Sequence, residues 1–379
     1  MTDTPTSPAP DSTPAVVRRA DVLISGCGPA GATAAAHLAA AGLDVVVLEK
    51  TAHPREKVCG DGLTPQAVRE LQLLGVPHRG EPGDDGGWRV IRGLRLRAGE
   101  RSVDVPWAPT QTWPDYALTR TRRDFDALLA ELARTRDAEV RERHAVTGVV
   151  RDEAGRVVGL DAELIAPNGR KTGETARFTA PIVLACDGVS ARAAVSAGLH
   201  RREDRPMGVA VRAYYTAGAA VDGAIPAPPG DRGEWMESWL RLPDAEGNPL
   251  PGYGWLFPLA DGTVNVGLGI LDTSPQFGKL DYRGLLKSWT GALTADWGSP
   301  SRRAPRGSSA RPCRWRSTAP RSTCRACSWW ATRPAWCPRS TARASGSRWR
   351  RPASPRSWRC RRTRPGPTAP RTRSCPVTR

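Results

Sequence analysis

The chain has 379 residues, enough for two domains, and its formal net charge of +18 would suit a nucleic-acid-binding protein. All of that excess lies in residues 301–379, which contain 22 Arg and no acidic residue, whereas the preceding residues carry 34 basic and 38 acidic side chains, a net charge of −4. We therefore expect no nucleic-acid partner, and no apolar run reaches the roughly 18 residues that a transmembrane helix needs.

Residues 1–19 are rich in Thr, Pro, Ser and Ala. They lack the apolar core of a signal peptide, so we expect a disordered leader. Only Cys27, Cys59 and Cys186 precede residue 300, which fits a reduced, cytoplasmic protein. The tail holds one Cys-x-x-Cys pair with no second pair and no nearby His, and we predict no metal site.

The stretch from Asp21 to Lys50 has the pattern of a strand, a helix and a second strand. Residues 21–25 are mostly apolar and predict a buried strand, an Ala-rich helix reaches about Gly42, and residues 44–48 predict the second strand. A glycine-rich turn separates the first strand from the helix. This order of elements is typical of dinucleotide-binding domains. Lys50, which directly follows Glu49 after the second strand, is included among the candidate cofactor-binding residues.

The glycines in this turn predict how a dinucleotide is held. Gly26 allows a tight turn, Gly28 lets the backbone approach a pyrophosphate, and Gly31 lets the helix pack close to the strand. Ala30 lies in the first helical turn, whose free N–H groups and positive dipole end attract phosphates. Glu49 closes the second strand, where a carboxylate can accept hydrogen bonds from an adenosine ribose.

A short loop at residues 54–65 combines glycines with charges of both signs. This composition suggests a backbone packed against a ligand, with Cys59, Gly60 and Asp61 as candidate binding residues; the alternative is an ordinary surface loop. The next residues, 65–74, predict a short helix, and strands with alternating apolar positions are expected between 88 and 105.

A second helix is predicted to begin near Arg122 and to run to about residue 136. Residues 146–160 predict a β-hairpin, and residues 178–185 predict a strand of nearly continuous apolar character. That strand leads into Cys-Asp187-Gly. An acidic turn at the carboxyl end of a buried strand lies where open α/β sheets bind ligands, and the alternative is a plain turn.

From residue 208 to about 270 the sequence predicts antiparallel strands rich in aromatic residues. We interpret this stretch as a second domain built on a β-sheet. Its aromatic side chains either form the core or line an apolar pocket. Glycines flank Tyr253, Trp255 and Phe257 and would let a ligand approach, which favours these three as substrate-pocket residues.

Residues 301–379 use only nine amino-acid types, with no Leu, Ile, Asp, Glu or Lys. Such a segment cannot bury enough apolar surface to fold. In the neighbouring reading frame, GC-rich codons for residues 327–346 would permit an apolar strand, a Gly-Asp loop and a helix. We therefore interpret residues 298–379 as an unstructured product of a frame shift between Trp297 and Cys313; the alternative is an Arg-rich arm for nucleic acid or membrane surfaces.

Several motifs occur in a fixed order and resemble one family. The glycine motif is followed by Pro-Arg-Glu-Lys-Val-Cys59-Gly-Asp-Gly-Leu-Thr-Pro, then Arg122-x-x-Phe-Asp, Cys-Asp187-Gly, and Tyr253-Gly-Trp-Leu-Phe-Pro. Together they resemble the geranylgeranyl reductase family of FAD-dependent oxidoreductases, most closely its actinobacterial menaquinone reductases. The resemblance covers roughly residues 20–297.

The resemblance implies an α/β fold like that of p-hydroxybenzoate hydroxylase. A Rossmann-like FAD-binding domain would span residues 20–200, with part of the substrate domain inserted near 85–118, and a β-rich substrate domain would span 201–297. It implies FAD as the cofactor and NAD(P)H or ferredoxin as the electron donor.

The family's cofactor contacts carry over residue by residue. Arg122 would lie along the FAD, Val146 would contact the adenine through its backbone, and Asp187 belongs to the second flavin motif. Cys59 and Gly60 would lie near the isoalloxazine. For Cys59 the alternative is a small buried apolar residue.

The implied activity is saturation of a C=C bond in a geranylgeranyl lipid or a menaquinone side chain. It requires an acid, fixed geometry and an apolar tunnel, and no residue stands out as the acid, so the catalytic residue stays unassigned. The implied partners are a prenyl-lipid or quinone substrate and, as a peripheral surface, the inner face of the cell membrane. A flavin-dependent aromatic monooxygenase on the same fold is one alternative, and a non-functional truncated product is another.

Overall fold

The computed structural model describes residues 16–200, 206–216, 228, 230–244 and 246–293, together with two short strands at 301–302 and 313–315. Most of the predicted leader and tail lies outside the described residues. So do the expected domain boundary at residue 201 and the residues expected from the frame shift, apart from those two strands.

A four-stranded parallel sheet carries the glycine-rich turn. Its strand order is β13-β2-β3-β9, and each neighbouring pair is parallel. β2 and β3 are short apolar runs in which every residue is buried, as expected where a parallel sheet is covered on both faces. The strands are β13 (Ile182–Ala185), β2 (Val22–Ser25), β3 (Val45–Leu48) and β9 (Glu139–Arg141).

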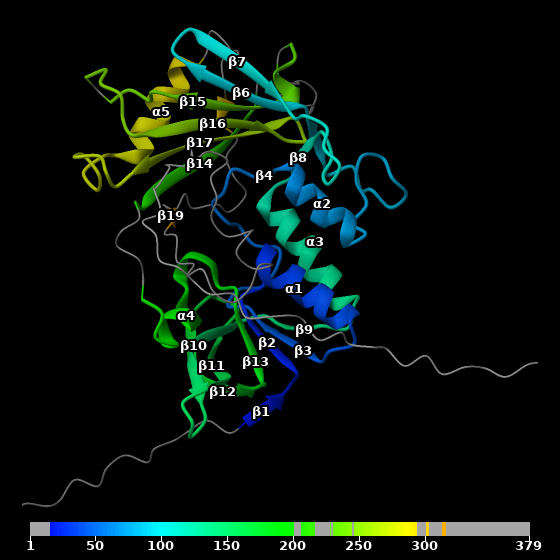
Figure 1. The fold of residues 1–379 in the computed structure, drawn as a ribbon. Helices are drawn as coiled ribbons and strands as arrows, with labels where there is room; N and C mark the ends of the chain where they lie inside the picture. The colour runs from blue at the N-terminus through cyan, green and yellow to red at the C-terminus, as the bar shows by residue number, and fades with distance from the viewer. Residues whose placement is uncertain are drawn as a thin grey trace, which may run out of the picture. The chain divides into compact units, whose positions relative to one another are not determined.

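Alternate residues of these strands enter two different cores. On one face, Val22 packs into a cluster with the helices α1 (Pro29–Ala40) and α3 (Arg122–Arg134). On the other face, Leu23 packs into a cluster with Phe178 of a second sheet. Figure 1 shows α1 and α3 lying side by side next to β2 and β3. The parallel sheet is therefore the middle layer of three. This packing on both faces fixes the position of the glycine turn, which follows the carboxyl end of β2.

The second sheet has the order β1-β12-β11-β10 and differs from the prediction at one strand. The stretch 178–185 is not one strand: it divides near Pro181, its first part ending β12 and its second part forming β13 of the other sheet. Proline has no N–H to continue a ladder, so the chain leaves one sheet there and enters the next. The sheet consists of β1 (Val16–Arg19), β12 (Lys171–Thr179), β11 (Val157–Ile165) and β10 (His144–Arg151).

β1 also differs from the expectation of a disordered leader up to residue 19. It pairs in parallel with β12, an outer strand of the three antiparallel strands, and so forms the edge of this sheet. Arg18 fastens it: its guanidinium donates to both carboxylate oxygens of Asp44, at 2.7 and 2.8 Å, and Nε donates to Glu139 at 3.0 Å. An open sheet edge and two acidic partners thus order residues whose composition alone suggests a leader.

A larger, eight-stranded sheet is built mainly from the part of the chain after residue 207. Along it the order is β18-β14-β17-β16-β15-β6-β7, and β19 also pairs with β14. β15 and β6 are parallel, and β6 and β7 precede residue 107, so the chain enters this sheet twice. The strands are β14 (Gly208–Thr216), β17 (Thr263–Leu271), β16 (Gly252–Pro258), β15 (Trp235–Leu240), β6 (Gly93–Ala98), β7 (Arg101–Pro106), β18 (Ser301–Arg302) and β19 (Cys313–Trp315).

β18 and β19 differ from the expectation that all residues from 298 onward are unstructured. Both pair antiparallel with β14. A sheet edge offers unpaired N–H and C=O groups, which bind an extended segment whatever its side chains are. Backbone pairing therefore orders these few residues although their composition gives no apolar periodicity.

The two faces of the eight-stranded sheet have different neighbours. Helix α5 (Tyr282–Ala292) covers the outer face, where the ring of Trp289 lies 6.2 Å from that of Trp239. The opposite face, which we call the inner face, carries Tyr214, Trp255, Phe257 and Asn265 and contacts the loop at residues 59–62. This contact brings the two halves of the sequence together.

A small sheet and a short helix join the layers. The sheet has the order β4-β8-β5, with β4 (Gly62–Leu63), β8 (Ala117–Thr119) and β5 (Arg89–Ile91). Helix α2 (Pro65–Leu73) follows β4, as predicted, and α4 (Arg192–Ser196) follows β13. In the described part of the chain, no helix is both long and apolar enough to span a membrane.

Candidate functional site

The glycine-rich turn between β2 and α1 has room for nothing larger than glycine at two positions. Gly26 adopts φ +94°, and a Cβ there would lie 2.7 Å from the Cys186 carbonyl oxygen. A Cβ on Gly31 would lie 1.9 Å from the Gly26 carbonyl oxygen. Gly28 is different, because the nearest atom to its Cβ position is the flexible Arg55 guanidinium at 3.8 Å. Two glycines therefore serve packing, and the third leaves backbone open to a ligand.

The N-terminus of α1 is suited to an anion. Its N-cap, Gly28, supplies no side-chain hydrogen bond, Pro29 begins the helix, and the first turn, which includes Ala30, contains no acidic residue. The first N–H groups of the helix and its positive dipole end are thus left to an external partner.

Glu49 lies at the end of β3 with 4% exposure. One carboxylate oxygen accepts from the Cys27 N–H at 2.8 Å, and the other accepts from the Thr51 hydroxyl at 2.8 Å. Burial acts to raise the pKa of Glu49, but the Arg55 charge and these hydrogen bonds hold it below its usual range. The carboxylate is therefore ionised and retains acceptor capacity. Lys50 follows it and is exposed.

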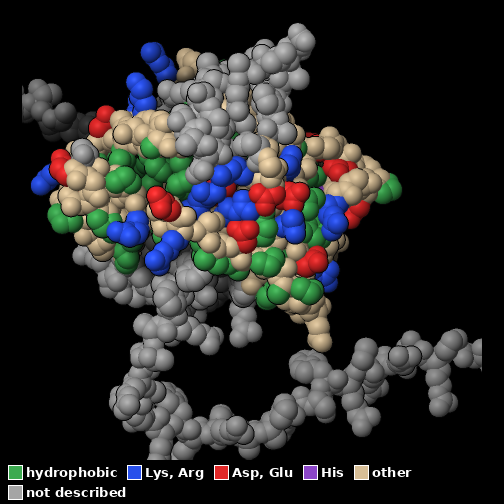
Figure 2. Space-filling model, turned by 90° about the horizontal axis from the view of Figure 1, so that it is seen from above, with side chains coloured by type: hydrophobic (Ala, Val, Ile, Leu, Met, Phe, Trp, Pro, Cys, Tyr) green, Lys and Arg blue, Asp and Glu red, His purple; other side chains and the backbone are tan. Residues whose placement is uncertain are grey.

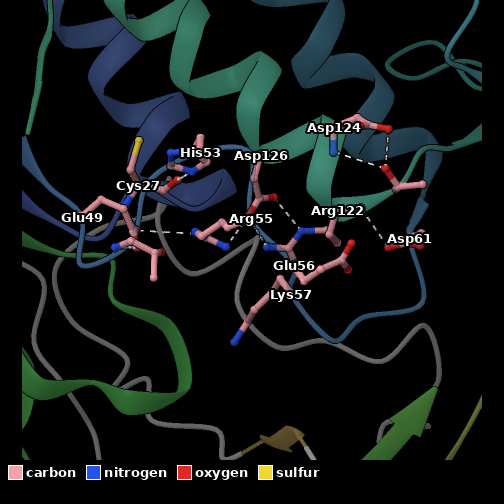
Figure 3. Close-up of polar contacts among 12 residues, drawn as sticks. Cys27, Glu49, His53, Arg55, Glu56, Lys57, Asp61, Arg122, Asp124 and Asp126 are labelled. Atoms are coloured by element: carbon pink, nitrogen blue, oxygen red, sulfur yellow. Dashed lines mark hydrogen bonds and ion pairs between the residues drawn. The ribbon is translucent and has the colours of Figure 1, made fainter. Parts of the chain in front are cut away.

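A chain of ion pairs runs from Glu49 to the start of α3 (Figure 3). Arg55 lies 3.6 Å from Glu49 and 3.0 Å from Asp126, which is fully buried. Arg122 forms a bidentate pair with the same Asp126, at 2.7 and 2.9 Å. Arg55 Nε is buried without a hydrogen-bond partner among the described residues. That unpaired donor, beside the open backbone of Gly28, fits an anionic ligand at this place.

Cys59 lies at the other end of this chain. Its thiol is half-buried, free of a disulfide, and beside the Arg122 guanidinium. Burial acts to lower the pKa of Arg122, but Cys59 and Asp126 raise it above its usual range. Burial and then Cys59 also raise the pKa of Tyr253. The Cys59 thiol therefore influences the titration of both the Arg122 guanidinium and the Tyr253 hydroxyl.

The loop at residues 59–62 is pressed onto the inner face of the large sheet. A Cβ on Gly60 would lie 2.8 Å from the Phe257 ring and 3.5 Å from the Trp255 indole nitrogen. Trp255 is buried at 4% exposure, whereas Tyr253 and Phe257 are half-buried. The structure thus brings Trp255 and Phe257 to the loop proposed for the cofactor, and the Tyr253 ring lies 5.9 Å from that of Trp255.

Val146 lies in β10 of the second sheet, and Asp187 lies in the turn that follows β13 of the parallel sheet. Val146 is buried in β10, opposite Ala162 of β11. Asp187 is half-buried, and its carboxylate accepts from the Ala193 N–H at 3.0 Å, which orders the start of α4. Its Cα would lie 2.9 Å from a Cβ on Gly26, so this turn directly adjoins the glycine motif.

Sequence reasoning missed several polar residues of this site. Arg55 and Asp126 lie inside motifs that were recognised, but nothing in the spacing showed that they pair. Tyr214 and Asn265 both donate to the buried Asp61 carboxylate. The one signal for Asn265 is a polar residue in the middle of an otherwise apolar strand.

Comparisons with known proteins cover most of the described residues. Residues 19–233 match the family model described as FAD binding domain. The menaquinone reductase of Mycolicibacterium smegmatis is 34% identical over 284 residues, which cover 74% of this chain and 62% of that protein. The digeranylgeranylglycerophospholipid reductase of Methanosarcina acetivorans is 28% identical over 259 residues, which cover 66% of this chain and 54% of that protein. The chain thus spans less than two thirds of the length of these relatives.

Among solved structures, a geranylgeranyl bacteriochlorophyll reductase-like protein of Thermoplasma acidophilum has a TM-score of 0.59 at 20% identity, covering 78% of this chain and 66% of that one. This likeness confirms the predicted fold class. The family match extends over more than half of the chain, and this protein therefore belongs to the FAD binding domain family.

Proposed function

We propose that this protein is an FAD-dependent reductase that saturates a carbon–carbon double bond in an isoprenoid chain. The observation that carries the proposal is the contact between the Cys59–Gly62 loop and the aromatic inner face of the large sheet. The names of the relatives, a menaquinone reductase and a digeranylgeranylglycerophospholipid reductase, support this class of substrate. The substrate of this chain is accordingly a geranylgeranyl lipid or the side chain of a quinone.

The first domain offers the groups that FAD requires. Gly26, Gly28 and Gly31 would bring the backbone of the turn to the pyrophosphate, and the N–H groups around Ala30 would donate to it. The unpaired Arg55 Nε would donate to the same anion. When bound, FAD supplies the hydride.

The remaining assigned residues lie around that turn. Glu49 would accept hydrogen bonds from the ribose, with the adjoining Lys50 nearby, and Val146 would contact the adenine through its backbone. Asp187 adjoins the glycine motif. Arg122 would lie along the cofactor because it continues the line of ion pairs from Glu49.

The second domain offers an apolar wall for the substrate. Tyr253, Trp255 and Phe257 occupy the inner face opposite Cys59 and Gly60, and their rings would exclude water from a prenyl chain held there. Asp61 holds this loop against the sheet. The residue that supplies the proton stays unassigned.

The partners follow from the substrate class. NAD(P)H or a ferredoxin would supply electrons. Because prenyl lipids and menaquinones reside in membranes, the protein would attach peripherally to the inner face of the cell membrane.

The test is a reduction assay with the full chain. The protein is supplied with added FAD, reduced anaerobically with dithionite, and incubated with menaquinone or a geranylgeranyl lipid in detergent. We expect a product that has gained two hydrogen atoms for each saturated bond, seen by mass spectrometry. In a parallel aerobic assay with NAD(P)H in place of dithionite, substrate-stimulated oxygen consumption with a hydroxylated product would instead establish a monooxygenase.

A further inference from the structure

Asp61 occupies an unusual position at the contact between the two domains. Its side chain is buried at 1% exposure, and its backbone adopts φ +65°, a region that non-glycine residues rarely occupy. The glycines on either side have no room for a side chain: a Cβ on Gly60 would lie 2.8 Å from Phe257, and one on Gly62 would lie 2.7 Å from the Met236 sulfur. The Asp61 peptide is therefore held in one conformation against the large sheet.

The Asp61 carboxylate collects hydrogen bonds from three distant elements. The Tyr214 hydroxyl of β14 and the Asn265 amide of β17 both donate to one oxygen, each at 2.7 Å. The Arg122 backbone N–H, at the start of α3, donates to the other oxygen at 3.0 Å. One buried carboxylate thus joins two strands of the eight-stranded sheet to helix α3.

Asn265 extends this hydrogen-bond network to the loop at residues 59–62. Its amide nitrogen also donates to the Cys59 carbonyl oxygen at 2.8 Å, and its carbonyl accepts from the Trp255 indole at 3.0 Å. The same side chain therefore sets both the position of the Cys59–Gly60 peptide and the position of Trp255 on the inner face.

Arg212 supplies the charge that accompanies the buried carboxylate. Its guanidinium stacks 4.2 Å above the Tyr214 ring and pairs with Glu56 at 2.9 Å. Burial raises the pKa of Asp61, and the Arg212 charge and the three hydrogen bonds oppose that rise. Arg212 thus favours the ionised carboxylate, which accepts from every donor that faces it.

We propose that Asp61 is a positioning residue: through Tyr214 and Asn265 it fixes the Cys59–Gly60 peptide against the inner face of the large sheet. The loop and the aromatic wall then keep one mutual register. The proposal rests on the proposed reductase function for its catalytic consequence, but the positioning itself is measurable in the chain without cofactor or substrate.

The test compares the rate at which Cys59 reacts with N-ethylmaleimide, read on its own peptide by mass spectrometry, in the unmodified full chain and three variants. Tyr214→Phe removes one donor to Asp61 and keeps the ring on Arg212. Asp61→Asn replaces an acceptor by an amide that faces donors. Tyr215→Phe is the matched control, because the neighbouring hydroxyl points to the other side, 3.4 Å from Thr290.

We expect Tyr214→Phe and Asp61→Asn to raise the Cys59 labelling rate roughly two- to tenfold, the range that loss of one net hydrogen bond allows, and Tyr215→Phe to leave it unchanged. Circular dichroism at the labelling temperature verifies that each variant is folded. If Asp61→Asn fails to fold, Tyr214→Phe decides the matter. Equal rates in Tyr214→Phe and the unmodified chain would overturn the proposal.

The reduction assay gives the second readout. At full flavin occupancy, we expect Tyr214→Phe to lower kcat by about tenfold or more with little change in KM. The substitution would misplace the loop but leave the residues that bind the substrate unchanged. An unchanged kcat in an active enzyme overturns the role. If the unmodified chain reduces no prenyl substrate, the proposed function fails, and the labelling rates still judge the positioning role.

Discussion

At the residue scale, a cluster of charged side chains in the large sheet surrounds one buried carboxylate. Glu237 is fully buried in β15 and lies 2.9 Å from Arg232, 3.4 Å from Arg97 and 4.0 Å from Arg95. Arg95 in turn pairs with Asp231 at 2.7 Å. Figure 2 shows basic and acidic side chains interspersed on the face seen from above. Each buried charge has opposite charges beside it, as burial requires.

This cluster predicts an acid-sensitive contribution to stability from Asp231. The hydrogen bond from Arg95 lowers the pKa of Asp231 from an ordinary value near 3.8 to about 2. The ionised carboxylate therefore stabilises the fold above about pH 4, and this contribution is lost as the pH falls through about 2. Thermal unfolding should show Asp231→Asn less stable at pH 7, within about 1 kcal/mol because the side chain is half-exposed, and the difference should vanish below about pH 2.

The control for this prediction is Glu234→Gln. Glu234 pairs with Arg92 at 2.9 Å, and both side chains are exposed. Exposed pairs contribute little, so we expect a small effect at every pH. A stability difference for Asp231→Asn that stays constant from pH 7 to pH 2 would contradict the assigned ionisation.

At the element scale, glycine placement decides which elements can touch. A Cβ on Gly254 of β16 would lie 2.3 Å from the Trp289 ring of α5, so the helix approaches the sheet only because this position is glycine. Gly291 of the same helix is exposed, and nothing lies within 4 Å of its Cβ position. Close packing therefore requires glycine at position 254, whereas a larger side chain would fit at position 291.

Alanine substitutions at these two glycines should act in opposite directions. Gly254→Ala forces the Trp289 ring out of its place and should lower the free energy of unfolding by about 1–3 kcal/mol. Gly291→Ala restricts the unfolded chain and suits a helix, so it should raise that free energy by up to about 1 kcal/mol. Chemical denaturation measures both. Destabilisation by Gly291→Ala as large as that by Gly254→Ala would contradict the packing described for α5.

The glycine turn allows a sharper separation of binding from folding. Gly28→Ala meets only the flexible Arg55 side chain, so we expect an unfolding temperature close to that of the unmodified chain but at least about tenfold weaker FAD binding, since the methyl group occupies the ligand side. Gly31→Ala collides with the Gly26 carbonyl and should lower both. Fluorescence titration with FAD and thermal unfolding distinguish the two cases. FAD binding to Gly28→Ala at full strength would place the pyrophosphate elsewhere.

At the scale of the whole molecule, the site depends on two parts of the chain that meet across the inner face. The residues that we propose for the cofactor lie between Gly26 and Asp187, and the aromatic residues that we propose for the substrate come from β16, after residue 250. We interpret the sequence from residue 298 onward as the product of a shifted frame, which would remove a Gly-Asp loop and a helix expected near the flavin. Most of that segment lies outside the described residues.

This reading predicts weak FAD retention by the chain as it stands. After gel filtration, the ratio of flavin to protein, measured by absorbance, should be well below one. A matched protein with the neighbouring frame restored from residue 298 should retain more flavin, because the loop and helix would again cover it. Full stoichiometric flavin in the unmodified chain would refute the reading.

The strand–turn–helix–strand unit that carries the glycine motif was predictable because its determinants are local. The apolar runs of β2 and β3, the spacing of Gly26, Gly28 and Gly31, and the acid at the strand end all lie within about thirty residues, where backbone geometry allows few arrangements. The order of motifs along the chain also predicted an FAD-dependent family, and the FAD binding domain match over residues 19–233 confirms that part of the prediction.

The pairing of distant polar groups was decided only by the tertiary structure. Asp126 pairs with Arg55, Asn265 binds the Cys59 carbonyl, and β6 joins β15 across more than a hundred residues. Apolar periodicity shows which side chains are buried, but it does not show which buried donor meets which acceptor. That choice depends on how the sheets and helices pack, because a buried polar group must find its partner wherever the fold places one.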